Sequence, residues 1–252
     1  SIRSTMKKTI VFILAFSFAT TPLLSQMLFA KKGDVLNIFA VSGLNLRAEP
    51  SITGKVITKI PYAEKVTVIE PSEYNDPIED RQGIWLKVQY KSQSGYLFSG
   101  YLTKLAVPKI DTAQITCYEF YEFPNWIKKT LKNDTLVSSG KRLFKRYDPD
   151  GKDWNSVNWE FYSSGTMVYH YFGYESETYV IESFDITLND ILNFLNYYAA
   201  LHHSKCDNKL TIKLNKTGSY DYFDKIECSD PRPFTATRLS GKTIIEISLW
   251  DL

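Results

Sequence analysis

Histidine and cysteine are the residues of this chain whose chemistry could include metal binding or nucleophilic catalysis, and it has three of each. His202 and His203 are adjacent in a stretch with helical spacing. Neighbours on a helix point about 100° apart, so the two rings cannot easily share one metal ion. A position at a helix C-terminus, where positive charge is favourable, explains them better. His170 lies between two tyrosines and is expected to be an ordinary sheet residue. We therefore expect neither a metal site nor a bound cofactor.

The segment DPDGKD at residues 148–153 has the carboxylates of a calcium loop but not their order. An EF-hand loop needs a third carboxylate or amide before its glycine, so a plain turn is expected here. The sequence also shows no nucleophile elbow, phosphate-binding loop, zinc signature or paired Cys and His block of the wall endopeptidases. It therefore gives no support for catalysis.

Cys117, Cys206 and Cys228 all fall in the C-terminal half of the chain. In an oxidising compartment one disulfide is expected, and Cys206 with Cys228 is the pair closest in sequence. Three reduced, buried thiols are the alternative. A catalytic cysteine is not favoured, because no recognisable motif supplies the His and the Asn or Asp partner that it would need.

The N-terminal residues have the pattern of an export signal. A positive Met-Lys-Lys start at residues 6–8 precedes an apolar run at residues 9–19, and small residues suit cleavage after Ser25 or Ala30. We expect residues 1–30 to be a signal peptide and the product to be periplasmic or secreted. No later segment approaches the roughly 20 apolar residues that a spanning helix needs, so no transmembrane segment is expected after signal removal.

The balance of charge argues against a nucleic-acid partner. The whole chain has 30 Lys and Arg residues against 28 Asp and Glu residues, and Arg3, Lys7 and Lys8 would leave with the signal. A nucleic-acid-binding protein normally shows a basic stripe, and none is visible. We therefore exclude this class of partner.

Three short blocks follow one another in the first half of the chain: LNLRAEPS at residues 44–51, GIWLKV at 83–88 and GYLFSGYL at 95–102. Glycine and proline punctuate the short β-branched and apolar runs around them, which predicts short strands. The blocks and their order resemble a bacterial SH3 domain over residues 35–105. The resemblance implies a small β-barrel that binds a cell-wall peptide or another protein segment, and it implies no chemistry.

The same resemblance implies a ligand groove that uses Trp85 and Tyr101, with Tyr74 in a flanking loop at residues 70–82. Alternation in residues 84–90 places Trp85 on the face opposite the core, which makes it a surface candidate. The flanking loop is rich in Asp and Glu and would favour an amine-bearing partner. The alternatives are that the aromatic residues only close the barrel and that the loop charges are simply solvated.

The chain beyond a Pro-containing boundary near residues 104–112 is expected to form a second, aromatic-rich β domain at residues 113–252. Its order of motifs loosely resembles small bacterial lipocalin-like domains, and a sequential antiparallel meander is the simplest topology. One clear helix is predicted at residues 187–203, with a capping pattern at its start, and a weaker helix signal lies near residues 125–131. The expected strands are residues 157–162, 166–172, 178–184, 209–214, 220–226 and 243–250.

Aromatic residues recur through the predicted strands of this second region: Trp159, Phe161, Tyr162, Tyr169, Tyr171, Phe172, Tyr174 and Tyr179. They could line a cavity for an apolar ligand or form a platform for a sugar. On antiparallel strands, alternate aromatic residues more often form core on one face and cross-strand pairs on the other.

The fold class predicted from the sequence is therefore mainly β, with an SH3-like barrel followed by a β-rich antiparallel domain that carries one clear helix. The predicted function is an exported, non-enzymatic binding protein of the cell envelope, whose partner is a wall peptide or a protein segment. The alternative is an accessory or catalytic component of a peptidoglycan hydrolase with an unrecognised C-terminal domain. This alternative rests on the frequent association of SH3-like domains with hydrolases.

The predicted bridge between Cys206 and Cys228 can be tested directly. It closes a loop of about 20 residues and should raise the free energy of unfolding by about 3 kcal/mol in the chain-entropy model. Alkylation of the unfolded chain without reductant, followed by intact-mass analysis, should label one thiol, at Cys117. Three labelled thiols would mean that no bridge forms, and a labelled Cys206 or Cys228 would mean that Cys117 is paired instead.

Overall fold

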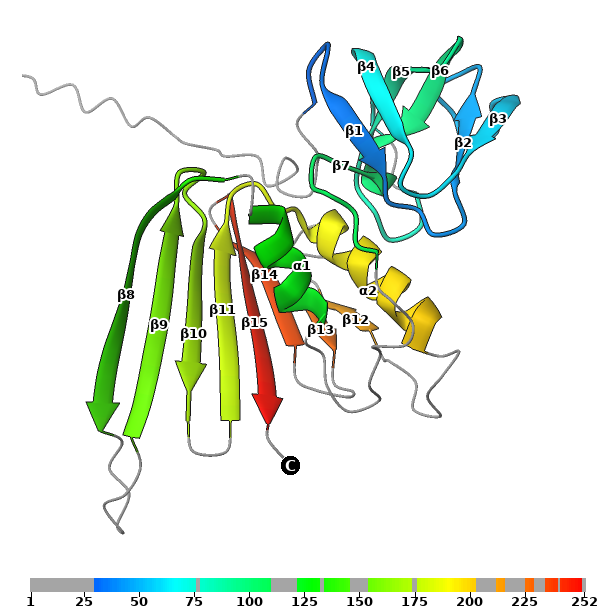
Figure 1. Ribbon diagram of the computed structural model, residues 1–252. Coiled ribbons are helices and arrows are strands. Elements are labelled where there is room, and N and C mark those ends of the chain that lie inside the picture. The colour runs from blue at the N-terminus through cyan, green and yellow to red at the C-terminus, as the bar shows by residue number, and fades with distance from the viewer. Residues whose placement is uncertain are drawn as a thin grey trace, which may run out of the picture.

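The computed structural model describes residues 30–75, 78–109, 122–131, 134–145, 154–173, 176–202, 212–215, 225–228, 234–239 and 241–250. Within these ranges the fold is mainly β, as predicted, with two sheets and two α-helices (Figure 1). The predicted signal peptide, the turn at residues 148–153, Cys117, Cys206 and His203 lie outside the described residues. For Tyr74, His202 and Cys228 only the backbone is described.

The first sheet has seven antiparallel strands, and all of them precede residue 104. They are β1 (Val35–Ile38), β2 (Leu44–Arg47), β3 (Val56–Ile60), β4 (Lys65–Asn75), β5 (Ile84–Tyr90), β6 (Gln93–Phe98) and β7 (Leu102–Thr103). Their hydrogen-bonded order is β3-β2-β6-β5-β4-β1-β7. The strands share one aliphatic core, which includes Leu36, Ile60, Leu86 and Leu97. In β5, Leu86, Val88 and Tyr90 are buried as the alternation predicted.

The second sheet has eight antiparallel strands. They are β8 (Leu136–Lys145), β9 (Trp154–Tyr162), β10 (Met167–Phe172), β11 (Ser176–Ser183), β12 (Ile212–Asn215), β13 (Lys225–Cys228), β14 (Phe234–Leu239) and β15 (Lys242–Trp250). Their order is β8-β9-β10-β11-β15-β14-β13-β12. The prediction of one continuous meander is wrong, because the chain leaves the sheet after β11 and returns so that its last strand, β15, lies beside β11. Among the described strands no pairing joins β8 to β12, so the lipocalin-like closure is not seen.

Two strands of this sheet were missed in the sequence. The first, β8, is exposed at nearly every described position, so its residues show no alternation of apolar and polar side chains. The second, β14, alternates buried Phe234 and Ala236 with two threonines. Alanine gives a weak strand signal, and two prolines precede the strand closely. Both strands are therefore defined by their neighbours in the sheet rather than by their own residues.

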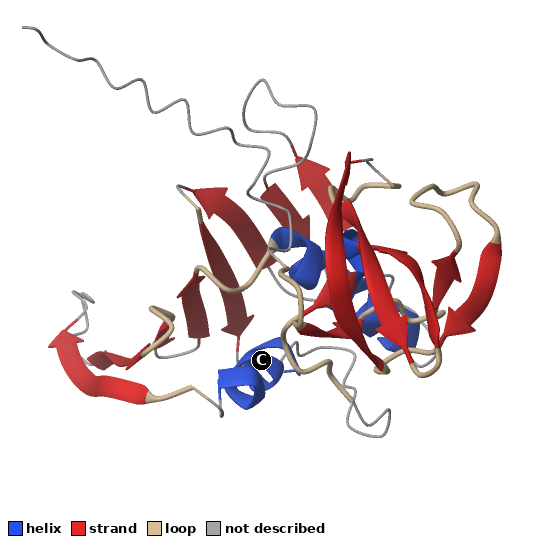
Figure 2. Ribbon diagram, turned by 90° about the horizontal axis from the view of Figure 1, so that it is seen from above, coloured by secondary structure: helices blue, strands red, loops and turns tan. Residues whose placement is uncertain are grey.

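Two helices, α1 (Glu122–Leu131) and α2 (Leu188–His202), lie on the same face of the second sheet (Figures 1 and 2). Both occupy positions where the sequence predicted helix. At the start of α2, Asp190 Oδ2 accepts a hydrogen bond from Thr187 N at 2.8 Å, and Asp190 N donates to Thr187 Oγ1 at 3.1 Å. This reciprocal capping box satisfies two backbone donors that the helix leaves unpaired. The helices and the sheet enclose a core that includes Trp126, Phe194, Phe234 and Ile245.

Aromatic side chains join the first sheet to this second core. Phe39 directly follows β1, but its buried ring packs edge-on against Trp126 of α1, with ring centroids 5.6 Å apart. Tyr62, between β3 and β4, stacks on Tyr197 of α2 at 5.0 Å and donates a hydrogen bond to the carbonyl oxygen of Pro108 at 2.7 Å. The two sheets are therefore held together by packed rings as well as by the chain that connects them.

A buried polar seam runs beside these rings. Asn193 of α2 accepts a hydrogen bond from Arg81 Nε at 2.9 Å and donates one to the carbonyl oxygen of Gly100 at 3.0 Å. Asn189, one turn earlier, donates to the carbonyl oxygen of Gln82 at 2.8 Å. Each bond joins α2 to a turn of the first sheet. Buried donors and acceptors are costly unless they are paired, so this seam fixes where α2 sits against the sheet.

The helices that the structure describes are too short or too polar to cross a membrane.

Removal of the Asn193 side chain should destabilise the polar seam between α2 and the first sheet. Asn193→Ala leaves the Arg81 guanidinium short of one acceptor inside the protein, and we expect the free energy of unfolding to fall by about 2 kcal/mol. Asn196→Ala is the matched control, because Asn196 is an exposed residue of the same helix and its loss should change stability by less than about 0.5 kcal/mol. Urea unfolding of the two variants measures the difference. Equal effects would mean that the seam contributes no stability.

Asp190 is a buried carboxyl at the same end of α2. Burial raises the pKa of Asp190 above its usual value of 3.8, against the opposing effects of hydrogen bonds from Thr103 and Thr187 and of the charge of Arg238. In the range between 3.8 and the higher folded pKa, the folded protein binds more protons than the unfolded chain. This group therefore stabilises the fold less as the pH rises through that range.

Asp190→Asn should remove this dependence on pH. Asparagine keeps an oxygen that can accept from Thr187, so the variant is expected to fold. The quantity to compare is the free energy of unfolding of the original chain minus that of the variant. We expect this difference to decrease as the pH rises from about 4 towards neutral. The decrease should be about 1.4 kcal/mol for each pH unit between the unfolded and the folded pKa of Asp190. Denaturant unfolding of both proteins at several pH values gives this difference. A difference that stays flat or grows with pH would contradict the expectation.

Candidate functional site

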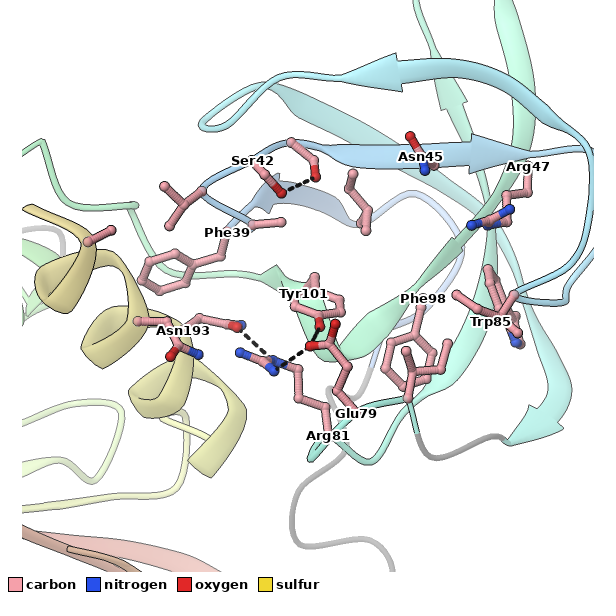
Figure 3. Close-up of a pocket in the computed structure, with 18 residues that line it drawn as sticks. Phe39, Ser42, Asn45, Arg47, Glu79, Arg81, Trp85, Phe98, Tyr101 and Asn193 are labelled. Carbon is pink, nitrogen blue, oxygen red and sulfur yellow. Dashed lines mark hydrogen bonds and ion pairs between the residues drawn. The ribbon is translucent and has the colours of Figure 1, made fainter. Parts of the chain in front are cut away.

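A cavity of about 580 Å³ lies between one end of the first sheet and α2 (Figure 3). Its walls come from the turn after β1, from β2 and the loop after it, from the turn before β5 with the start of β5, from the end of β6 with the turn after it, and from α2. Side chains that line it include Phe39, Asn45, Arg47, Glu79, Arg81, Trp85, Phe98, Tyr101, Asn193 and Asn196. The cavity therefore brings together two of the three residues that sequence reasoning selected, Trp85 and Tyr101.

Trp85 lines this cavity but is not the exposed residue that was predicted. It is only 1% exposed, because Phe98 packs edge-on against it with ring centroids 5.9 Å apart. Phe98 can lie there because of two glycines: a Cβ at Gly83 would lie 2.8 Å from its ring, and a Cβ at Gly100 would lie 2.6 Å from it. The alternation correctly placed Trp85 away from the aliphatic core, but the aromatic ring above it covers it.

Tyr101 lies at the open side of the cavity in a polar cluster with Glu79 and Arg81. Its hydroxyl donates a short hydrogen bond to Glu79 Oε2, and the same oxygen is 3.4 Å from Arg81 Nη1. The Arg81 guanidinium carbon lies 4.3 Å above the Tyr101 ring. Burial raises the pKa of Tyr101, and the hydrogen bond to Glu79 raises it further, so the phenol stays protonated at neutral pH.

The backbone of a tight turn places Glu79 in this cluster. Ile78 and Arg81 exchange two backbone hydrogen bonds of 3.1 Å each, and Glu79 between them has a φ of 55°. Few residues other than glycine adopt this left-handed conformation, and such strain is typical of functional positions. The carboxylate of Glu79 is held by Tyr101 and Arg81 and is still 67% exposed.

Arg81 itself is almost fully buried, and burial lowers the pKa of its guanidinium, with Tyr101 and Glu79 acting in the opposite direction. On the other side of the cavity, Arg47 donates a hydrogen bond to the carbonyl oxygen of Gly54 at 2.7 Å and remains partly exposed. The cavity therefore carries both signs of charge around an aromatic wall. The sequence did not indicate that Arg81 and Asn193 belong to this site, because their hydrogen bonds join residues more than 90 positions apart in the chain.

Tyr74 was predicted in a loop at residues 70–82, but it lies in β4, which continues to Asn75. Of the acidic residues expected in that loop, Glu79 lines the cavity, whereas Glu70 pairs with Lys87 on the sheet at 3.3 Å. Asp80, the next residue, is exposed, and its charge acts on Arg81 and Tyr101. Of the expected negative rim, the described residues therefore show Glu79 on the cavity wall and Asp80 beside it.

The aromatic side chains of the second sheet that the structure describes line neither this cavity nor a smaller one of about 300 Å³ next to α1. Tyr174 lies outside the described residues. Tyr179 is buried in the core on the helix side, where it stacks on His170 at 3.9 Å. His170 also contacts Glu177 at 3.1 Å and is the sheet residue that was expected. Tyr169 and Tyr171 stack at 6.3 Å on the face without helices. These residues are distributed as core and as surface pairs.

The described part of the chain contains no group of three or more His, Cys, Asp or Glu side chains arranged to hold a metal ion.

Comparison with protein families gives a match for the first sheet. Residues 42–103 match the family model described as the bacterial SH3 domain. Comparison with curated proteins gave no match, and comparison with solved structures gave none either. The matched range covers β2 to β7 and most of the cavity wall, except for the residues of α2 and the first part of the turn after β1. Residues 42–103 are therefore a bacterial SH3 domain, which suggests a module that binds the cell wall or a protein.

Proposed function

We propose that this chain is an exported, non-enzymatic binding protein of the cell envelope, and that the cavity between the SH3 domain and α2 receives a wall peptide or an extended segment of a protein. The observation that carries the proposal is the make-up of this cavity. It has a preformed aromatic wall of Trp85, Phe98 and Tyr101, and it has charged groups of both signs at its opening. Rigid aromatic surfaces with a few fixed polar groups are typical of peptide-binding sites.

The two signs of charge favour a ligand that also carries both. Glu79 offers an exposed carboxylate to an ammonium group. Arg47 uses one guanidinium nitrogen on Gly54, and the other donors of its planar fork suit a carboxylate. The stem peptides of a cell wall carry free amines and carboxylates, as do the side chains of many protein segments. The mixed charge fits such a zwitterionic peptide better than a purely basic one.

The wall formed by α2 gives the second region a part in this binding. Asn193, Asn196 and Ala200 line the cavity, and Asn193 also holds Arg81 in place. In this proposal the SH3 domain alone offers an incomplete site. The export part of the proposal rests on the pattern of residues 1–30, in which a positive start, an apolar run and small residues follow one another.

Binding to purified, insoluble cell-wall material tests the proposal. Glu79→Gln removes the exposed charge and should weaken binding about tenfold, which corresponds to about 1.4 kcal/mol. Glu70→Gln is the matched control, because Glu70 is an exposed carboxylate of the same sheet that does not line the cavity. Trp85→Ala is a poor test, because removing a buried tryptophan costs about 3–5 kcal/mol of stability. A loss of binding by this variant could not be distinguished from unfolding.

The proposal fails for wall peptide if the unaltered protein does not co-sediment with the wall, or if Glu70→Gln weakens binding as much as Glu79→Gln. Release of soluble muropeptides from the wall by the purified protein would instead support the hydrolase alternative and would overturn the non-enzymatic proposal.

A further inference from the structure

One edge of the eight-stranded sheet is an open strand. Among the described strands, β8 pairs with β9 alone, and it stands at the end of the strand order (Figure 1). It is ten residues long, with a bulge between Leu136 and Ser138 and a regular ladder from Ser138 to Lys145. An edge strand of this length leaves a row of backbone N–H and C=O groups that can pair with another strand.

Nothing in the described part of the chain covers either face of β8. The helices lie over the part of the sheet that runs from β11 through β15 and β14 to β13 (Figure 1). None of the β8 side chains that the structure describes belongs to either hydrophobic core. The side chains of Leu136, Val137 and Leu143 are 49%, 57% and 62% exposed. Leu136 and Val137 lie at one end of the strand and Leu143 lies near the other. A strand added to this open edge would therefore meet exposed apolar side chains at both ends.

The charge of the strand indicates which partner fits. Lys141 and Arg142 are exposed, and β8 contains no acidic residue. A second copy paired with β8 would bring the cations of both copies onto one ladder, and like charges across a ladder destabilise it. Lysine and arginine on an edge strand are a known means of preventing such self-pairing. The same cations attract a strand that carries carboxylates.

The face of β8 away from the helices has a further feature. Gly140 lies opposite Trp159 of β9, and a Cβ at Gly140 would lie 2.5 Å from the Trp159 ring. The indole therefore lies across the backbone of β8. In an added strand, the side chain of the residue next to Gly140 would meet this aromatic ring. The residues before and after it in the added strand would point to the other face of the sheet, on the side of Lys141. This favours an apolar residue next to Gly140 and an acidic one next to Lys141. Further along the ladder the pattern reverses, because Arg142 shares the face of Gly140 and Leu143 shares the face of Lys141.

We propose that β8 accepts an extended, acidic segment of another protein as a ninth strand of the sheet, with an apolar side chain beside Gly140 and Trp159 and a carboxylate beside Lys141. Main-chain hydrogen bonds supply the affinity in this mode of binding, and the alternating side chains supply the specificity. The proposal is independent of the cavity at the SH3 domain, since β8 contributes no residue to that cavity.

Fluorescence anisotropy of the purified chain with a labelled peptide, Glu-Val-Glu-Val-Glu-Val-Glu, tests the proposal. In an extended peptide, the backbone N–H groups of the valines and those of the glutamates point to opposite edges. One version of the peptide is therefore N-methylated on the valines and another on the interior glutamates, so that each version blocks one of the two possible hydrogen-bonding edges. We expect the unmethylated peptide to bind and at least one methylated version to bind at least tenfold more weakly. Lys141→Glu should weaken binding at least fivefold, and Lys213→Glu, on the opposite edge strand β12, should change it less than twofold.

Several outcomes would overturn the proposal. One is that the acidic peptide does not bind. Another is that all three peptides bind equally, which would indicate attraction by charge alone. A third is that Lys141→Glu and Lys213→Glu have equal effects. A concentration-dependent dimer in sedimentation experiments that Lys141→Glu abolishes would assign the edge to a second copy of this chain and would also overturn it. Circular dichroism of both variants serves as the check that each has folded.

Discussion

The contact on which the arrangement of this protein depends is the one between Arg81 and Asn193. Arg81 is 5% exposed, and a guanidinium removed from water is costly unless its donors are satisfied. One partner is the amide of Asn193 on α2, and the others are the carboxylate of Glu79 and the ring of Tyr101. The buried guanidinium of Arg81 thus joins a turn of the SH3 domain, the wall of its cavity and a helix of the second region. If any of the three moved, this guanidinium would be exposed to water or would lose a partner.

This arrangement explains why the cavity is preformed. The turn at residues 78–81 holds Glu79 in a left-handed conformation, which the backbone bonds between Ile78 and Arg81 and the side-chain contact with Tyr101 stabilise. On the opposite wall, Phe39 is fixed because its ring also packs in the second core. A ligand of the proposed kind would meet side chains that are already ordered, so the protein would lose little conformational entropy on binding it.

The sequence predicted the features that depend on local patterns. The blocks at residues 44–51, 83–88 and 95–102 identified the SH3 domain, and the capping pattern at Thr187 identified the start of α2. Patterns of this kind report which face of an element is apolar, but not what covers the other face. Trp85 was therefore placed on the correct face and wrongly considered exposed. The polar seam could not be predicted, because Arg81 and Asn193 come from segments that only the tertiary fold brings together.

The seam also explains why one end of the large sheet is bare. Each half of the second region is a helix followed by four strands, α1 with β8 to β11 and α2 with β12 to β15, and the last strands of the two halves meet at the centre of the sheet. Two helices cannot cover eight strands. The contacts of α2 with the SH3 domain and of Trp126 on α1 with Phe39 hold both helices towards that domain. Among the described strands, those at the end of the sheet away from that domain carry no helix (Figure 1). Lys141 and Arg142 place charge on the open edge that results, which disfavours indiscriminate pairing of strands there.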